Sequence, residues 1–182
     1  MKKLFITACL AISTVAFADS VTLSYQSVDN LTKADQYRIG MNYSRPLNRN
    51  WTGDVNFNNQ HTEGTDALSS TRIETGLTYT ARSLPLPLYV RAAVGQKFSS
   101  SGAFEYYSIE PGVRFPVGPV TVRLGYRWRT SFNPTVNNDQ THTTLLSVRY
   151  LVSAHDSVGV GYNRTTGDNQ QNVISVNYTR NF

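Results

Sequence analysis

The chain has 182 residues, with 17 Lys or Arg against 12 Asp or Glu and a formal net charge of +5, which is enough sequence for one domain. Its only cysteine is Cys9, which excludes an internal disulfide and a cysteine-based metal site, and three His are too few and too scattered to predict a metal centre. Beyond the N-terminal segment no stretch approaches the ~18 apolar residues that a transmembrane helix needs.

The first residues have the layout of a secretory signal peptide. Met1-Lys2-Lys3 is a short cationic start, residues 4–15 are mostly apolar, and Ala16-Phe17-Ala18 is a small-x-small cleavage site. We therefore expect residues 1–18 to be removed and residues 19–182 to form a single exported domain. Loss of the two lysines would lower the Lys and Arg count from 17 to 15, against 12 acids.

The rest of the chain alternates apolar and polar residues with a period of two, which is the pattern of half-buried β-strands. The alternation predicts ten strands: residues 21–28, 36–44, 51–59, 71–81, 87–98, 104–116, 119–131, 142–151, 157–164 and 172–182. Pro111 lies inside the sixth of them, and because it lacks a ladder donor we expect a bulge there. Strands that are each only half apolar can cross a membrane when they close into a barrel.

The connections between these segments predict the topology. Four are tight and five are longer and polar, and the two kinds alternate along the chain, as periplasmic turns and outside loops do in outer-membrane barrels. The tight ones lie at 45–50, 83–85, 116–119 and 153–156, and the longer ones at 30–35, 60–70, 99–103, 133–140 and 165–171. The predicted fold is an all-β, transmembrane, antiparallel up-and-down β-barrel of about ten strands, with eight or twelve strands as alternatives.

Aromatic residues collect near the ends of the predicted strands, as expected of the girdles that lie at the two membrane interfaces. Those at the expected periplasmic ends are Tyr43, Trp51, Phe115, Tyr150 and Phe182, and those near the outer ends are Phe57, Tyr107, Trp128, Phe132 and Tyr162.

The last predicted strand alternates Ile174, Val176 and Tyr178 with polar residues and ends at Phe182. It resembles the terminal strand of bacterial outer-membrane β-barrels, although Arg180 stands where that class usually has an apolar or aromatic residue. The resemblance implies a location in the bacterial outer membrane. It also implies that Tyr178 and Phe182 are the signal read by the barrel-assembly machinery, with periplasmic chaperones as further partners during biogenesis.

The polar face of the predicted barrel is rich in cations. Its acids are only Asp54, Glu74 and Glu110, which cannot pair with all of them, and an unpaired buried cation costs several kcal/mol. We therefore expect water, counter-ions or an anionic solute inside, since guanidinium groups bind carboxylates and rings of Arg or Lys line anion pores. The candidate lumen and solute-contacting residues are Arg38, Arg72, Arg91, Arg114, Arg123, Arg127, Arg129 and Arg149, with Glu74 and Glu110.

Two runs in the centre of the chain carry a resemblance to a family. Tyr106-Tyr107-Ser108-Ile109-Glu110-Pro111-Gly112-Val113-Arg114-Phe115 and Val122-Arg123-Leu124-Gly125-Tyr126-Arg127-Trp128-Arg129 are similar to strands of the oligogalacturonate-specific monomeric porins. Members of that family have twelve strands and are longer. The resemblance implies passive uptake of short acidic sugars by a monomer, with Arg114, Arg123, Arg127 and Arg129 contacting the solute.

Alternative interpretations remain at this point. Small barrels are often filled by side chains, so Glu74 and Glu110 could each hold two arginines and plug the lumen of a purely structural or adhesion-type barrel. Cations near the outer rim, namely Arg38, Arg72 and Arg129, could instead meet lipopolysaccharide phosphates.

A lipid-modifying enzyme or protease is a third alternative. Only His61, near Glu63 and Asp66, and His142, near Asp139, suggest catalysis, and no pair satisfies the logic of nucleophile, base and orienter. We expect no enzyme activity, no cofactor, no metal and no nucleic acid. The expected partners are outer-membrane lipid, lipopolysaccharide and small anionic solutes.

Overall fold

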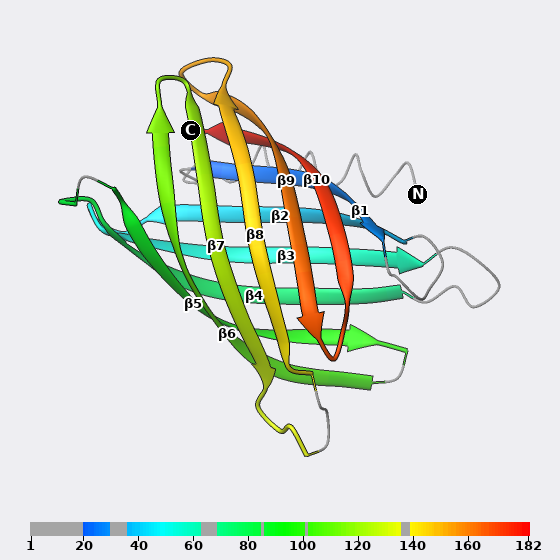
Figure 1. Cartoon of the computed structure of the whole chain (residues 1–182). Helices are drawn as coiled ribbons and strands as arrows, with labels where there is room; N and C mark the ends of the chain where they lie inside the picture. The colour runs from blue at the N-terminus through cyan, green and yellow to red at the C-terminus, as the bar shows by residue number, and fades with distance from the viewer. Residues whose placement is uncertain (1–19, 30–35, 63–68, 85, 101, 136–138) are drawn as a thin grey trace.

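The computed structural model describes residues 20–29, 36–62, 69–84, 86–100, 102–135 and 139–182; the expected signal peptide lies outside them. Ten strands form one closed antiparallel barrel (Figure 1). They are β1 (Ser20–Asp29), β2 (Gln36–Pro46), β3 (Trp51–Thr62), β4 (Ser69–Ala81), β5 (Leu88–Ser99), β6 (Gly102–Val117), β7 (Val120–Ser131), β8 (Thr141–Leu151), β9 (Asp156–Gly167) and β10 (Gln171–Asn181). No helix among the described residues is long and apolar enough to cross a membrane.

The predicted fold class is confirmed, and the strand number is ten rather than eight or twelve. Each strand pairs with its neighbours in sequence, and the barrel closes between β1 and β10, which lie side by side in blue and red in Figure 1. Their pairing runs without a shift from Ser20 opposite Asn181 to Asp29 opposite Asn172. Closure pairs the backbone groups that an open sheet would leave exposed at its edges.

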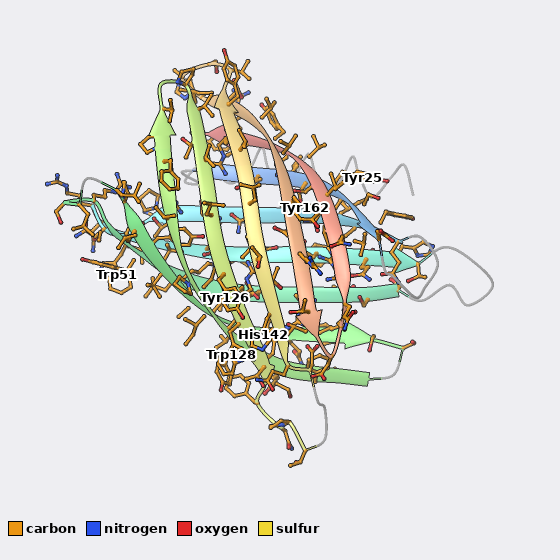
Figure 2. All side chains as sticks on the ribbon, viewed as in Figure 1. Tyr25, Trp51, Tyr126, Trp128, His142 and Tyr162 are labelled. Carbon is orange, nitrogen blue, oxygen red and sulfur yellow. The ribbon has the colours of Figure 1, made fainter. Side chains whose placement is uncertain are left out.

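The outer surface of the barrel is apolar. Ile174 and Val176 on β10 and Tyr25 on β1 are 62%, 58% and 57% exposed. Figure 2 shows Trp51 projecting from the β2–β3 end of the barrel, while Tyr126, Trp128 and His142 gather on β7 and β8. Soluble monomers rarely expose contiguous apolar areas of more than a few hundred Å². The alternation of the sequence thus places apolar side chains outside and polar side chains inside.

The predicted alternation in loop length fails at the β5–β6 and β9–β10 connections. The termini of the barrel and the turns after β2, β4, β6 and β8 share one end, as expected. At the other end, however, β5 stops at Ser99 and β6 starts at Gly102, and only residues 168–170 separate β9 from β10. The polar residues that were predicted to form these loops belong instead to the ends of the strands, which extend beyond the apolar part of the outer surface.

The bulge expected at Pro111 is also absent. Pro111 faces Val90 of β5 in an unbroken ladder, and the register between β6 and β7 is the same on both sides of it. The ladder with β7 stops at Ile109 opposite Trp128 and resumes at Gly112 opposite Gly125. The missing donor therefore interrupts the pairing locally without inserting a residue.

Candidate functional site: the barrel interior

A buried ion cluster joins three strands across the interior. Arg91 on β5 donates to Asp54 on β3 through Nε at 3.0 Å and through Nη2 at 2.5 Å, and its Nη1 donates to Glu74 on β4 at 2.6 Å. Because β4 separates β3 from β5 in the sheet, Arg91 can reach Asp54 only through the barrel interior. Gly76 leaves the room for this crossing, since a Cβ there would lie 2.6 Å from Nη2 of Arg91.

A second cluster surrounds Glu110 on β6. Its carboxylate, fully buried, accepts from Nε of Arg127 at 2.8 Å, from the hydroxyl of Tyr89 at 2.9 Å and from Nη2 of Arg123. Arg123 also donates through Nε to the Tyr89 oxygen at 2.7 Å, and its guanidinium lies 4.7 Å from the centre of that ring. Tyr89 thus links β5 to β7 across β6.

Two tyrosine rings fill this side of the interior by lying over glycines. A Cβ at Gly95 would be 2.5 Å from the hydroxyl of Tyr106 and 2.7 Å from the carbonyl oxygen of Ile73. A Cβ at Gly112 would be 2.5 Å from the carbonyl oxygen of Leu124 and would overlap the ring of Tyr89. Only glycine permits so close an approach, and both rings are buried.

The interior at the end of the barrel that carries the β7–β8 loop contains four cations and, among the described residues, one acid. Arg38 donates to Gln60 at 2.6 Å and to Gln26 at 3.2 Å. Arg72 and Arg129 both lie against the Tyr106 ring, at 5.7 and 5.2 Å from its centre. The fourth cation, Lys97, lies over Phe104 at 5.5 Å.

The single acid is Asp139, which pairs with Arg129 at 2.8 Å. Nε of Arg72 and Nε of Arg129 are buried without a hydrogen-bond partner. This end of the interior therefore holds cations whose hydrogen-bonding capacity is only partly used.

Two arginines lie at the opposite end, near the chain termini. Arg114 sits beside Arg123 in the β6–β7 ladder, and its guanidinium is 5.1 Å from the centre of the Tyr89 ring. Arg149 on β8 is exposed at the mouth. Neither makes an ion pair with a described carboxylate.

The interior charges therefore separate along the barrel. In the middle, three arginines (Arg91, Arg123, Arg127) balance three acids (Asp54, Glu74, Glu110). The three acids thus pair with these three arginines and leave the other interior cations to different partners, in line with the expectation that they cannot pair with all of them. The excess of positive charge lies at the two ends, on Arg38, Arg72, Lys97 and Arg129 against Asp139, and on Arg114 and Arg149.

The interior is also asymmetric around its axis. The wall from β3 to β6 carries most of the bulky buried groups, whereas several inward positions in the wall from β8 through β10 to β2 hold glycine or small polar side chains. These are Ser147, Gly161, Asn163, Ser175, Asn177, Ser24 and Asn42. Arg123 and Arg127 keep 33% and 27% of their side-chain surface exposed, while Glu110 between them keeps 1%. Arg123 and Arg127 therefore keep part of their surface free of protein contact in the middle of the barrel.

All ten sequence-predicted lumen residues lie on the inward face of their strands. The alternative that Arg38, Arg72 and Arg129 meet lipid phosphates is wrong, because their side chains contact Gln60 and Tyr106 inside the barrel. Sequence reasoning missed Tyr89, Tyr106 and the glutamines as partners of these cations. Tyr89 lies two residues before Arg91 on the same polar face of its strand, and this position could have identified it as an interior residue.

The histidines form no catalytic constellation with the described residues. Nδ1 of His142 is 2.8 Å from the hydroxyl of Tyr126 on the outer surface, and Asp139 pairs with Arg129 instead. His61 packs against the ring of Tyr37, and its expected neighbours Glu63 and Asp66 lie outside the described residues. Within the described ranges no group of three or more His, Cys, Asp or Glu could hold a metal ion.

No family model matches the chain, and no curated protein matches its sequence. Its structure is similar to that of a KdgM porin in complex with disordered oligogalacturonate, at 9% identity and a TM-score of 0.50, covering 90% of this chain and 99% of that one. The chain shares the transmembrane β-barrel fold of that porin. A NanC porin (10% identity, 90% and 99% covered, TM-score 0.47) and an anion-selective porin from Comamonas acidovorans (15%, 80% and 49%, TM-score 0.43) are also similar. The similarity to the KdgM porin confirms the resemblance of the central strands at the level of the fold.

Proposed function

We propose that the chain is an outer-membrane barrel that lets small anionic solutes, such as acidic oligosaccharides, pass passively through its lumen. The observation that carries this proposal is the charge excess at both ends of the interior, combined with a middle in which the acids are already paired. Cations in excess attract anions into a low-dielectric passage and repel cations. The apolar exterior supports the location in a bilayer.

One strand supplies three cations along the proposed path. Arg129, Arg127 and Arg123 lie on the inward face of β7, and six residues of extended chain span about 20 Å. Arg114 and Arg149 continue the line toward the terminal end. A polyanion could exchange one guanidinium for the next along this line, facing the small-residue wall. The fold of the KdgM porin, whose solved complex contains oligogalacturonate, is consistent with such a solute.

A closed structural barrel is the second candidate, and the two buried clusters favour it. Arg91, Glu74, Glu110, Tyr89 and Tyr106 are almost entirely inaccessible to solvent and fill one side of the interior. If the small-residue wall leaves no continuous passage, the barrel conducts nothing. In both cases we expect β10, with its Tyr178, and the Phe182 that follows it to direct assembly in the membrane.

Solute uptake by liposomes separates the two candidates. Purified protein would be reconstituted into vesicles, and swelling would be recorded in a short galacturonate oligomer and in a neutral glucose oligomer of equal length. The proposal predicts faster entry of the galacturonate oligomer. Replacing Arg114 and Arg149 by Gln should weaken the preference, whereas Arg180→Gln, on the outer surface, should retain it. Equal entry of both sugars would remove the anion preference, and no entry of either would establish the closed barrel.

A further inference from the structure

One arginine faces away from the interior, at the loop end of the outer surface. Val158, Val160 and Tyr162 occupy the outward face of β9 and are all exposed, and Arg164 is the next residue on that face. Its cross-strand neighbours are Thr144 on β8 and Asn172 on β10. Arg164 makes no hydrogen bond or ion pair with any described residue. Among the residues that the structure describes, this permanent charge has no partner where the apolar surface ends.

This arginine lines a cavity of about 230 Å³ at the β9–β10 hairpin. The donors around it are the guanidinium of Arg164, the hydroxyl of Thr166 and the side-chain amides of Gln170 and Asn172. No carboxylate lines it. The acid of this hairpin, Asp168, accepts the backbone N–H of Gln140 at 2.7 Å. The cavity is thus positive, rich in donors and large enough for a phosphate group.

A hydrogen bond beside the cavity fixes the orientation of the Asn172 side chain. The hydroxyl of Tyr162 donates to Oδ1 of Asn172 at 3.0 Å. This bond occupies the amide oxygen and fixes the orientation of the side-chain amide. The Nδ2 hydrogens of Asn172, which have no described acceptor, remain available to a ligand.

The depth of the cavity is set by its aromatic neighbours. The hydroxyls of Tyr162 and, farther round the barrel, of Tyr126 make polar contacts on an otherwise apolar surface, as tyrosines do at the headgroup level (Figure 2). Arg164 lies two residues beyond Tyr162 toward the hairpin. In a strand tilted by about 45° that spacing raises it by about 5 Å along the membrane normal. This height matches the phosphates of a lipid leaflet.

We propose that this cavity binds the phosphate of an outer-leaflet lipid headgroup, with Arg164 as the charged fork and Thr166, Gln170 and Asn172 as neutral donors. Guanidinium matches phosphate geometry and gains further strength from charge-assisted hydrogen bonds. The proposal rests on the outer-membrane location given above, but it does not depend on conduction. In this proposal the contact to lipid phosphate is the outward Arg164, and not the interior Arg38, Arg72 and Arg129 that the sequence suggested.

The test measures the thermal unfolding of the purified full chain in octyl glucoside, titrated with bisphosphorylated lipid A or with the same lipid lacking both phosphates. We expect only the phosphorylated lipid to raise the unfolding midpoint of the wild type. Loss of one charge-assisted contact in Arg164→Gln should weaken the apparent affinity about tenfold. Arg180→Gln, which removes an outward arginine at the opposite end, should bind like the wild type.

Three results would overturn the proposal: equal affinity in Arg164→Gln and the wild type, equal stabilisation by the two lipids, or full competition by millimolar inorganic phosphate, which would assign the site to free anions. Insertion into planar bilayers is recorded on the same preparations. Loss of lipid binding in a protein that inserts removes only this site, whereas failure to insert removes the membrane location itself.

Discussion

Arg91 on β5 binds Asp54 on β3 with two hydrogen bonds, across a strand that lies between them. The contact ties together strands that share no backbone pairing, and the same guanidinium also holds Glu74. The tilt of the strands brings the three side chains to one level of the interior. The charge balance of Asp54 and Glu74 therefore depends on one side chain.

Replacing Arg91 by Met should destabilise the barrel strongly. The change leaves Asp54 and Glu74 buried without a cation, and breaking a buried ion pair in this way costs about 3–5 kcal/mol. The measurement is the free energy of unfolding in urea, with Arg82→Met in an exposed turn as the control. The triple variant that adds Asp54→Asn and Glu74→Gln should recover most of the loss. A triple variant as unstable as the single one would contradict this account.

Glu110→Gln should increase anion selectivity. The middle of the lumen would then hold three arginines against two acids, and Arg123 and Arg127 would lose the charge that they share. We also expect a loss of about 1–3 kcal/mol in stability, because hydrogen bonds to a charged group become bonds to a neutral one. The anion-to-cation permeability ratio is the readout. Glu105→Gln, on the same strand but facing outward, should leave this ratio at the wild-type value.

A bulky residue on the small-residue wall should narrow the path. Ser147 lies beside Arg123 in the β7–β8 ladder and faces the solvent-accessible part of the interior. In planar bilayers Ser147→Trp should reduce single-channel conductance severalfold, whereas Thr144→Trp, on the outer face of the same strand, should not. An unchanged conductance in Ser147→Trp would place the path elsewhere.

Alanine at the glycines under the tyrosine rings should impair folding. Gly95→Ala and Gly112→Ala each force a methyl group against a backbone carbonyl and a buried ring, and overpacking of this kind costs about 1–3 kcal/mol. Gly53→Ala is the matched control, since its methyl group would lie 3.7 Å from Leu47 at ordinary contact distance. Urea unfolding of the three variants measures their stabilities, and we expect Gly53→Ala to be the most stable of the three. Equal stabilities would show that the rings can move aside.

The sequence predicted the strands and their faces because a period of two assigns each side chain to one side of a sheet. It did not predict the partners of Arg91, since contacts between strands two apart depend on tilt and stagger, which no local pattern encodes. The prediction of the loop lengths was wrong for a related reason. Polar strand ends such as Thr165–Gly167 have the composition of loops, yet they continue the ladder. Arg164 was not predicted, because it lies on the outward face and the predicted binding residues were the cations of the inward face.

The most direct test is the reversal potential of single channels in planar bilayers under a KCl gradient, compared between the wild type and the variant with Arg114→Gln and Arg149→Gln. We predict that the wild type prefers chloride and that the variant shifts toward zero selectivity, while Arg180→Gln behaves like the wild type. A wild-type channel that prefers potassium, or a variant with an unchanged reversal potential, would contradict the claim that unpaired cations at the ends of the lumen select the solute.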